Sequence, residues 1–273
     1  MAVTYSNKIF EKAARLNVRT AKMRGKVDET IRYTPKDIDN AFYTDNRNIL
    51  DCVKGNGYWL WKPYFIKKSL DRLNDGDLLI YADAASYYMN DVHLLESFMI
   101  AEGIDKLFFS LRNDRAERKY TKRDVFIEMN ADHINKDNPQ VDASCFLIMK
   151  NERNCELIDK WLHYCCDEHL ITDEKSVLAP EDQEFITHRH DQSILSVVLK
   201  CEGVAFYRDP SQWDKEDNYD LQLKEKSNYP QILNHHRMRN AFCVSYVKFR
   251  QTEFMRKVDY KLYLMKERKN VDE

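Results

Sequence analysis

The sequence predicts an α/β fold, in which helices flank a sheet, and the prediction depends on two observations. First, the chain opens with a β-prone segment at residues 2–5, an amphipathic helix over residues 8–22 and a strand over residues 29–33. This order is the beginning of a βαβ unit. Second, a short apolar run over residues 78–82 ends at an acid, Asp83. The carboxyl ends of strands are where open α/β sheets bind ligands, because a crevice opens there.

The remaining elements follow from apolar periodicity and from turn residues. We expect further helices over residues 35–42, 64–73, 91–102, 154–168 and 193–199, and further strands over residues 105–111, 140–150 and 203–207. Residues 1–240 therefore form one domain, and residues 241–273 form a helical C-terminal extension. The expected helix over residues 243–268 mixes apolar with basic residues, which is typical of a docking helix or of a basic amphipathic helix at a membrane surface.

The composition is that of a globular protein of 273 residues, 43% hydrophobic and 32% charged. Six glycines and six prolines make disordered and fibrous classes poor fits, and a net charge of −2 gives no general reason to expect a nucleic-acid partner. No apolar run approaches the length of a membrane span, the N-terminus lacks a signal-peptide pattern, and the seven cysteines include no CxxC motif. We expect a cytoplasmic protein, and the membrane-surface alternative for its C-terminal helix implies peripheral contact with the inner face of a membrane.

Three stretches carry polar side chains in places that suit a site, and each has a structural alternative. Asp83 precedes the small Ala84 and Ala85, so it either faces a ligand or caps a turn. Lys62 lies in an aromatic segment after a glycine-rich loop, where it packs in the core or points at a phosphate. Residues 188–192, HRHDQ, precede an apolar helix and are more polar than a helix cap requires.

Two further stretches leave similar alternatives. The charged run over residues 112–123 favours a solvated surface, and in the alternative Lys122 and Arg123 reach a diphosphate. The neighbouring His235 and His236 are either metal ligands or part of a surface loop, and Arg237 beside them has the chemistry to hold a phosphate.

The segments GYWLWKP (residues 57–63) and HRHDQS (residues 188–193), with Asp83-Ala84-Ala85, resemble a family of bacterial and viral sugar transferases of the GT-A type. These transferases are often found with polysaccharide genes, and their fold is a Rossmann-like mixed sheet flanked by helices. With the flanking strands, the resemblance covers most of residues 2–240.

The chain is more distantly similar to the retaining transferases of the glycogenin type. Asp83-Ala84-Ala85 stands where that group has its DxD motif, and Asp142-Ala143-Ser144 where it has N-A-G. Asp191-Gln192-Ser193 resembles its DQD segment, and His235 or His236 takes the place of its late metal-binding histidine. Ala85 removes one metal-binding carboxylate of the DxD motif, so dependence on Mn²⁺ or Mg²⁺ is an open expectation.

These resemblances imply a role for each candidate residue. Thr4, Tyr5 and Ser6 bind the nucleoside, and Asp83 binds the ribose or a metal. Lys62, His235, His236 and Arg237 face the diphosphate, with Asp83, His235 and His236 as the metal ligands. Asp142 binds a sugar hydroxyl. His190 and Asp191 contact the acceptor, where Asp191 orients it or acts as base, and Gln192 lies near the anomeric carbon.

The resemblance implies a glycosyltransferase that moves a hexose from a nucleotide-diphosphate sugar, with a UDP-sugar favoured, to a glycan or lipid-linked acceptor in surface polysaccharide synthesis. In a retaining reaction the leaving phosphate takes the acceptor proton, and in an inverting reaction Asp191 takes it. The alternative is a non-catalytic protein of the same fold that binds a nucleotide or glycan, and Ala85 is the best support for it.

Overall fold

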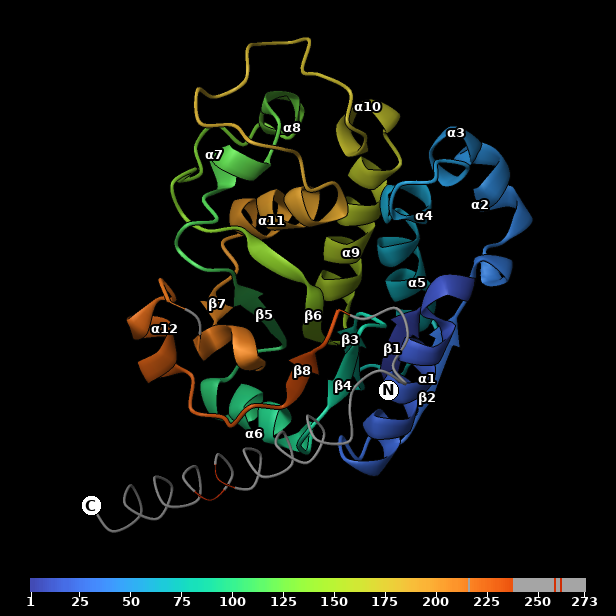
Figure 1. Cartoon of the computed structure of the whole chain (residues 1–273), viewed down its shortest axis with the longest axis vertical. Helices are drawn as coiled ribbons and strands as arrows, with labels where there is room; N and C mark the ends of the chain where they lie inside the picture. Colours follow the sequence, from blue (N-terminus) through green and yellow to red (C-terminus); the bar gives the residue numbers. More distant parts are fainter. Residues whose placement is uncertain (216, 238–257, 259–260, 262–273) are drawn as a thin grey trace.

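A six-stranded sheet forms the centre of the protein, whose computed structural model describes residues 1–215, 217–237, 258 and 261 (Figure 1). The strand order is β2-β1-β3-β6-β5-β7, and β6 alone runs antiparallel to its neighbours. The strands of this sheet are β1 (Ala2–Tyr5), β2 (Thr30–Tyr33), β3 (Leu78–Ala82), β5 (Lys106–Ser110), β6 (Val141–Met149) and β7 (Phe206–Tyr207). A second, two-stranded sheet pairs β4 (Ser86–Tyr88) with β8 (Leu233–His235).

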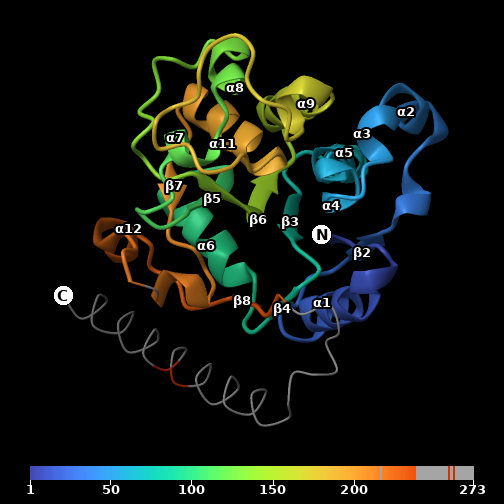
Figure 2. The ribbon, with the colours of Figure 1, turned by 45° about the horizontal axis from the view of Figure 1, so that its top comes forward.

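Helices cover both faces of the six-stranded sheet (Figure 2). One face packs against α5 (Trp61–Leu70), α9 (Glu152–Cys165) and α11 (Asp191–Cys201), and the other against α1 (Glu11–Met23), α6 (His93–Glu102) and the β4–β8 pair. The shorter helices are α2 (Asn40–Asp45), α3 (Arg47–Leu50), α4 (Gly55–Tyr58), α7 (Glu117–Tyr120), α8 (Arg123–Glu128), α10 (Glu168–Ile171) and α12 (Leu221–Lys226), with 3₁₀ turns at Lys8–Phe10, Pro35–Asp37 and Gln212–Lys215.

The alternation of side chains along each strand divides the apolar residues between two cores. Leu79 and Tyr81 of β3 join the core under α5, α9 and α11, whereas Ile80 and Ala82 join the core under α1 and α6. A strand that is covered on both faces is expected to be apolar throughout, which explains the continuous run at residues 78–82. The predicted α/β class is therefore confirmed.

The helix expected over residues 35–42 was wrong, because a 3₁₀ turn replaces its first half. The Asp37 carboxylate accepts hydrogen bonds from the backbone N–H and the hydroxyl of Thr34, which closes a single turn. Ile38 and Asp39 are then extended, and the Asp39 carboxylate accepts a hydrogen bond from the Tyr64 hydroxyl. The first regular helix after this turn begins at Asn40.

The expected boundary after residue 240 and the helix expected over residues 243–268 lie outside the described residues, apart from positions 258 and 261. Within the described ranges, every helix is too short or too polar to cross a bilayer.

A left-handed turn precedes α5. Five consecutive residues, Gly55 to Trp59, have positive φ angles, and Gly57 has the largest at 93°. Left-handed backbone costs a residue with a side chain roughly 1–2 kcal/mol. The backbone N–H of Gly57 donates to the Cys52 carbonyl and that of Tyr58 donates to the Lys54 carbonyl, so the turn satisfies its own polar groups. Strain of this kind persists only where the surrounding structure fixes it, and it is common at functional sites.

We predict that Gly57→Ala destabilises the fold more than Gly103→Ala. Both glycines have positive φ, but a Cβ on Gly57 would lie 2.9 Å from the Leu50 Cα, whereas a Cβ on Gly103 meets nothing within 4 Å. Gly103→Ala should therefore cost only the backbone strain, about 1 kcal/mol, and Gly57→Ala about 2 kcal/mol or more. Urea unfolding measures the free energy of unfolding of both variants. Equal losses of this free energy would show that the approach of Gly57 to the Leu50 backbone is not important.

Candidate active site

Three carboxylates meet at one edge of the sheet. Asp83 directly follows β3, and Asp209 lies just after β7. Asp142 is the second residue of β6, which runs the other way, so the start of β6 lies at the edge where its neighbours end. Asp142 and Asp209 are buried. The position of Asp83 at the end of a buried strand is as the sequence predicts.

Lys62 of α5 joins Asp83 to Asp191, the first residue of α11. Its ammonium nitrogen lies 3.4 Å from a carboxylate oxygen of Asp83 and 3.2 Å from one of Asp191, and it donates to the Ala143 carbonyl at 3.0 Å. Burial by itself would lower the pKa of Lys62, but the charges of Asp191 and Asp83 outweigh it and raise the pKa above its usual value. Lys62 is therefore a permanent buried cation rather than a core aliphatic chain.

Asp191 has an unusual environment for a carboxyl group. Burial raises its pKa to about 6, against the opposing effect of Lys62, and the charge of Asp83 raises it further. Asp83 itself accepts a hydrogen bond from the Tyr81 hydroxyl at 2.5 Å. Asp191 is therefore ionised at pH 7 in most molecules. This carboxylate loses its charge as the pH falls through about 6.

The two sequence segments that carry the family resemblance are in direct contact. The Trp59 ring stacks on the His190 ring with centroids 5.4 Å apart, and the Tyr58 ring lies 5.0 Å from the same imidazole. Both aromatic residues come from the left-handed turn, so this turn aims them at the segment before α11. Lys54 and the Tyr58 hydroxyl bind Asp173, which ties the same turn to the chain after α10.

A cavity of about 350 Å³ opens between these segments. Its lining comes from the residues that flank α4, from α5, the end of β3, the start of β6 and the segment that enters α11: Lys54, Trp59, Lys62, Asp83, Ala143, Ser144, His188, Arg189, His190, Asp191 and Gln192. His190 has φ 55° and shares a hydrogen bond between its Nδ1 and the Ile171 carbonyl. Burial lowers the pKa of His190 to about 4, so it is neutral at pH 7. The Gln192 amide donates to Gln140, which holds it in place.

The second sheet brings the late histidines to the Asp83 turn. Ser86 of β4 pairs with His235 of β8, and the backbone N–H groups of His236 and Arg237 donate to the Ala85 carbonyl. Asp83-Ala84-Ala85 and His235-His236-Arg237 thus lie side by side although about half the chain separates them. This contact puts His235 at the same edge of the sheet as Asp142.

Asp142, Asp209 and His235 form a candidate metal site. One ligand atom from each lies within 4.8 Å of the other two, and all three residues are buried. The Nε2 atom of His235 has no hydrogen-bond partner within the described part of the chain, which leaves it available as a ligand. Two carboxylates and an imidazole suit a divalent cation such as Mn²⁺ or Mg²⁺. Of the three expected ligands, only His235 belongs to this cluster, because Asp83 contacts Lys62 and His236 stacks against Tyr87.

Residues assigned to the nucleoside lie at the end of β1. The hydroxyl oxygens of Thr4 and Ser6 are buried and lack a hydrogen-bond partner among the residues described. The Tyr5 ring stacks on Trp61 with centroids 3.8 Å apart, and its hydroxyl accepts a hydrogen bond from Asn56. Tyr5 therefore supports the left-handed turn, while Thr4 and Ser6 place two buried hydroxyl groups without a described partner at the end of β1.

Lys122 and Arg123 do not lie where the diphosphate alternative needs them. Lys122 is buried, and its ammonium group donates to backbone carbonyls of His169, Thr172 and Glu174. Arg123 forms an ion pair with Asp132. Both cations stabilise the chain around α8 and α10, so neither Lys122 nor Arg123 is available to bind a diphosphate.

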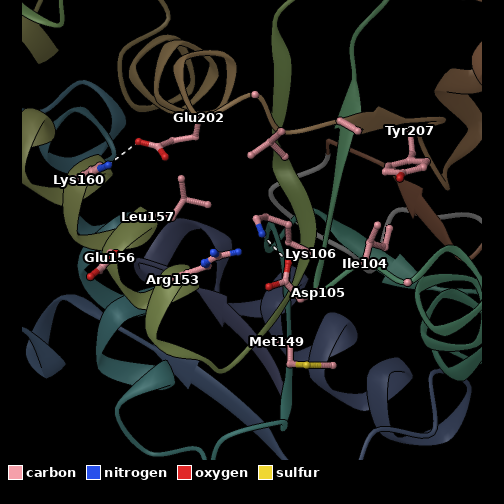
Figure 3. A pocket seen from close by; sticks show the side chains of 14 residues that line it. Ile104, Asp105, Lys106, Met149, Arg153, Glu156, Leu157, Lys160, Glu202 and Tyr207 are labelled. Carbon is pink, nitrogen blue, oxygen red and sulfur yellow. Dashed lines mark hydrogen bonds and ion pairs between the residues drawn. The ribbon is translucent and has the colours of Figure 1, made fainter.

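A larger cavity, of about 830 Å³, lies at the opposite edge of the sheet, where β5 begins and β6 ends (Figure 3). Its charged lining residues include the ion pairs Lys160–Glu202 and Lys106–Asp105. Arg153 extends from α9 into the same space (Figure 3). Neither the three carboxylates nor Lys62 lines this cavity, so we do not assign it to the site.

No protein-family model matches the chain, and no curated protein is significantly similar to it. Among solved structures it is similar to the galactosyltransferase LgtC in complex with donor and acceptor sugar analogues, with 12% sequence identity, a TM-score of 0.51, and coverage of 93% of this chain and 96% of LgtC. An active-site mutant of LgtC matches with 12% identity and a TM-score of 0.50, and the match covers 92% of this chain and 95% of the mutant. The protein has a GT-A fold. This likeness, together with the strand order, confirms the fold expected from the sequence.

Most of the site residues expected from the sequence come together in the structure. Lys62, Asp83, Asp191 and Gln192 line one cavity, and Asp142 and His235 meet beside it. Asp209 was not among the site residues expected from the sequence, because Arg208-Asp209-Pro210 was interpreted only as the signal of a strand end. That signal was sufficient in principle, because Asp209 follows an apolar strand in the way that Asp83 does.

We predict that Lys62→Met destabilises the protein by about 3–5 kcal/mol, because it leaves two neighbouring carboxylates without their cation. The matched control is Lys67→Met on the same helix. Its ammonium pairs with Asp159 at the surface, and the side chain is 41% exposed, so the loss should stay within about 1 kcal/mol. Urea unfolding compares the two variants, and a similar small loss in both would contradict the role of Lys62.

We predict that Mn²⁺ binds more tightly at about pH 8 than at about pH 6. Burial raises the pKa of Asp209 well above its usual range, and the nearby Asp142 raises it further, so a proton competes with the metal at the lower pH. His235→Ala should weaken Mn²⁺ binding at least tenfold, as measured by calorimetry. His163→Ala, which removes an exposed imidazole from α9, is the control. Binding that is unchanged in His235→Ala would contradict this site.

Proposed function

We propose that this protein is a glycosyltransferase that moves a hexose from a nucleotide-diphosphate sugar to a glycan or lipid-linked acceptor in surface polysaccharide synthesis. The observation that carries the proposal is the position of the Lys62–Asp83–Asp191 group beside the Asp142–Asp209–His235 cluster, at the ligand-binding edge of a GT-A fold. The preference for a UDP-sugar follows from the resemblance to glycogenin-type transferases.

The donor extends from β1 toward β6 in this proposal. The buried hydroxyls of Thr4 and Ser6 bind the nucleoside, and Asp142, Asp209 and His235 hold a divalent cation. When bound, the cation supplies positive charge that stabilises the diphosphate leaving group. Arg237, two residues after His235, contributes a second positive charge from the wall of the neighbouring cavity.

The sugar occupies the 350 Å³ cavity in front of α11. Ser144 donates hydrogen bonds to Asp142 from both its N–H and its hydroxyl, which fixes this carboxylate at the cavity edge. Asp191 remains ionised at neutral pH and stabilises the positive charge that develops on the anomeric carbon. Lys62 holds Asp191 and Asp83 in place without leaving either carboxylate isolated in a buried setting.

The same arrangement also serves the alternative, a protein that binds a nucleotide or glycan without turnover. The specific feature that favours it is Ala85, which removes a carboxylate from the position of the DxD motif. The buried Asp209, however, supplies a second carboxylate beside Asp142 and His235 from another part of the chain. We therefore favour the transferase.

We predict that Asp191→Asn lowers the turnover of a nucleotide-sugar at least a hundredfold, because the amide cannot carry the negative charge that the reaction uses. The assay follows nucleotide release from UDP-glucose and UDP-galactose first, and then from other nucleotide-sugars, with Mn²⁺ present. Asp159→Asn, on the exposed face of α9, is the control.

In the wild type, turnover should fall as the pH drops through about 6, where Asp191 becomes protonated. Full turnover in a folded Asp191→Asn variant would contradict the role of Asp191. Nucleotide binding without turnover of any nucleotide-sugar would favour the alternative.

A further inference from the structure

A third cavity, of about 330 Å³, lies beside the candidate metal cluster, at the ends of β5 and β7. Four arginines from three separate segments line it: Arg112, Arg115, Arg189 and Arg237. The single carboxylate among its lining residues is Asp209, and the aromatic residues Trp213 and Tyr219 complete the wall. The lining therefore holds four cationic side chains and one acidic side chain.

The positive charge of this cavity is only partly neutralised. Arg112 forms two hydrogen bonds with Asp114, at 3.0 and 3.1 Å, and Arg115 lies 3.6 Å from the same carboxylate. In contrast, no carboxylate of the described chain lies within ion-pair distance of the guanidinium groups of Arg189 and Arg237. Burial lowers the pKa of Arg189, and the neighbouring Arg115 and Arg237 lower it further, although an arginine remains protonated.

Aromatic contacts hold these guanidinium groups in fixed orientations. Arg189 lies over the Tyr120 ring at 4.4 Å, and Arg237 lies over the Trp213 ring at 4.7 Å. Arg115 donates to the Tyr120 hydroxyl at 2.6 Å. A guanidinium that is already held in place loses little freedom when it binds, and its planar fork matches the oxygens of a phosphate. The cavity is therefore organised for an anion before one arrives.

The location of the cavity separates it from the proposed donor. Three strand steps lie between β1, where the nucleoside is placed, and β5, and this corresponds to roughly 14 Å. The cation cluster adjoins the arginine cavity, because Asp209 belongs to both, and Asp142 of the cluster comes from β6, between β1 and β5. The cavity for the sugar is in front of α11. Arg189 lines both cavities, so a molecule in the arginine cavity reaches toward the sugar.

We propose that the arginine cavity binds a phosphate group of the acceptor, so that the acceptor is a phosphorylated glycan, with Arg115 and Arg189 as its principal contacts. This inference rests on the proposed function, because it uses the placement of the donor on the other side of the cation cluster. The phosphate positions the acceptor while its hydroxyl points toward Asp191.

The test is a calorimetric titration of the full-length protein with phenyl phosphate after saturation with UDP and Mn²⁺. We expect phenyl phosphate to bind while UDP remains bound. Arg115→Gln and Arg189→Gln should each weaken this binding at least tenfold, and Arg189→Lys should weaken it less, because it keeps the charge but loses the fork. The matched control is Arg153→Gln, which removes an exposed arginine at the opposite edge of the sheet and should leave binding unchanged.

Three outcomes would overturn the inference. Displacement of phenyl phosphate by UDP would assign the arginines to the donor diphosphate. A lack of phenyl phosphate binding to the wild type would remove the anion site. Unchanged binding in folded Arg115→Gln and Arg189→Gln variants would place the anion elsewhere. Failure of the proposed function gives a different result, namely that no nucleotide binds although phenyl phosphate still does.

Discussion

The buried cation of Lys62 between Asp83 and Asp191 is the interaction on which the site depends. It joins a strand end, the first turn of α5 and the first turn of α11, and two of the three charged groups are almost fully buried. A lone charge in such a place would be strongly unfavourable, so each group is stable only while the others are in position. The three elements are thereby held in one geometry, and the cavity between them has a defined shape.

The left-handed turn before α5 aims aromatic side chains at the other elements of the site. Its backbone strain is offset by the contacts that it makes possible, since Trp59 and Tyr58 reach His190 while Trp61 stacks on Tyr5. A right-handed turn of the same length would direct these rings elsewhere. The GYWLWKP segment thus connects α5 to the segment before α11 through ring contacts. Its glycine, Gly57, is required by the positive φ angle of the turn and not by contact with a ligand.

Charge is distributed unevenly over the ligand-binding edge. Carboxylates gather near β3 and β6, where Lys62 pairs with Asp83 and a candidate cation site lies beside it, and arginines gather beyond β5. A donor diphosphate and an anionic acceptor would each find a positive partner in this arrangement, on opposite sides of Asp209. The two anions would remain apart, which limits their mutual repulsion while the sugar lies between them.

The sequence by itself determined the alternation of strands and helices, the acid at the end of β3 and the polar segment before α11, because these features follow from local periodicity and from short motifs. It could not show that Asp209 joins Asp142 and His235, since strands far apart in the chain bring them together. Nor could it show that Lys62 bridges two carboxylates or that four arginines share a cavity. Such contacts are decided by tertiary packing, which sets distances that no local pattern records.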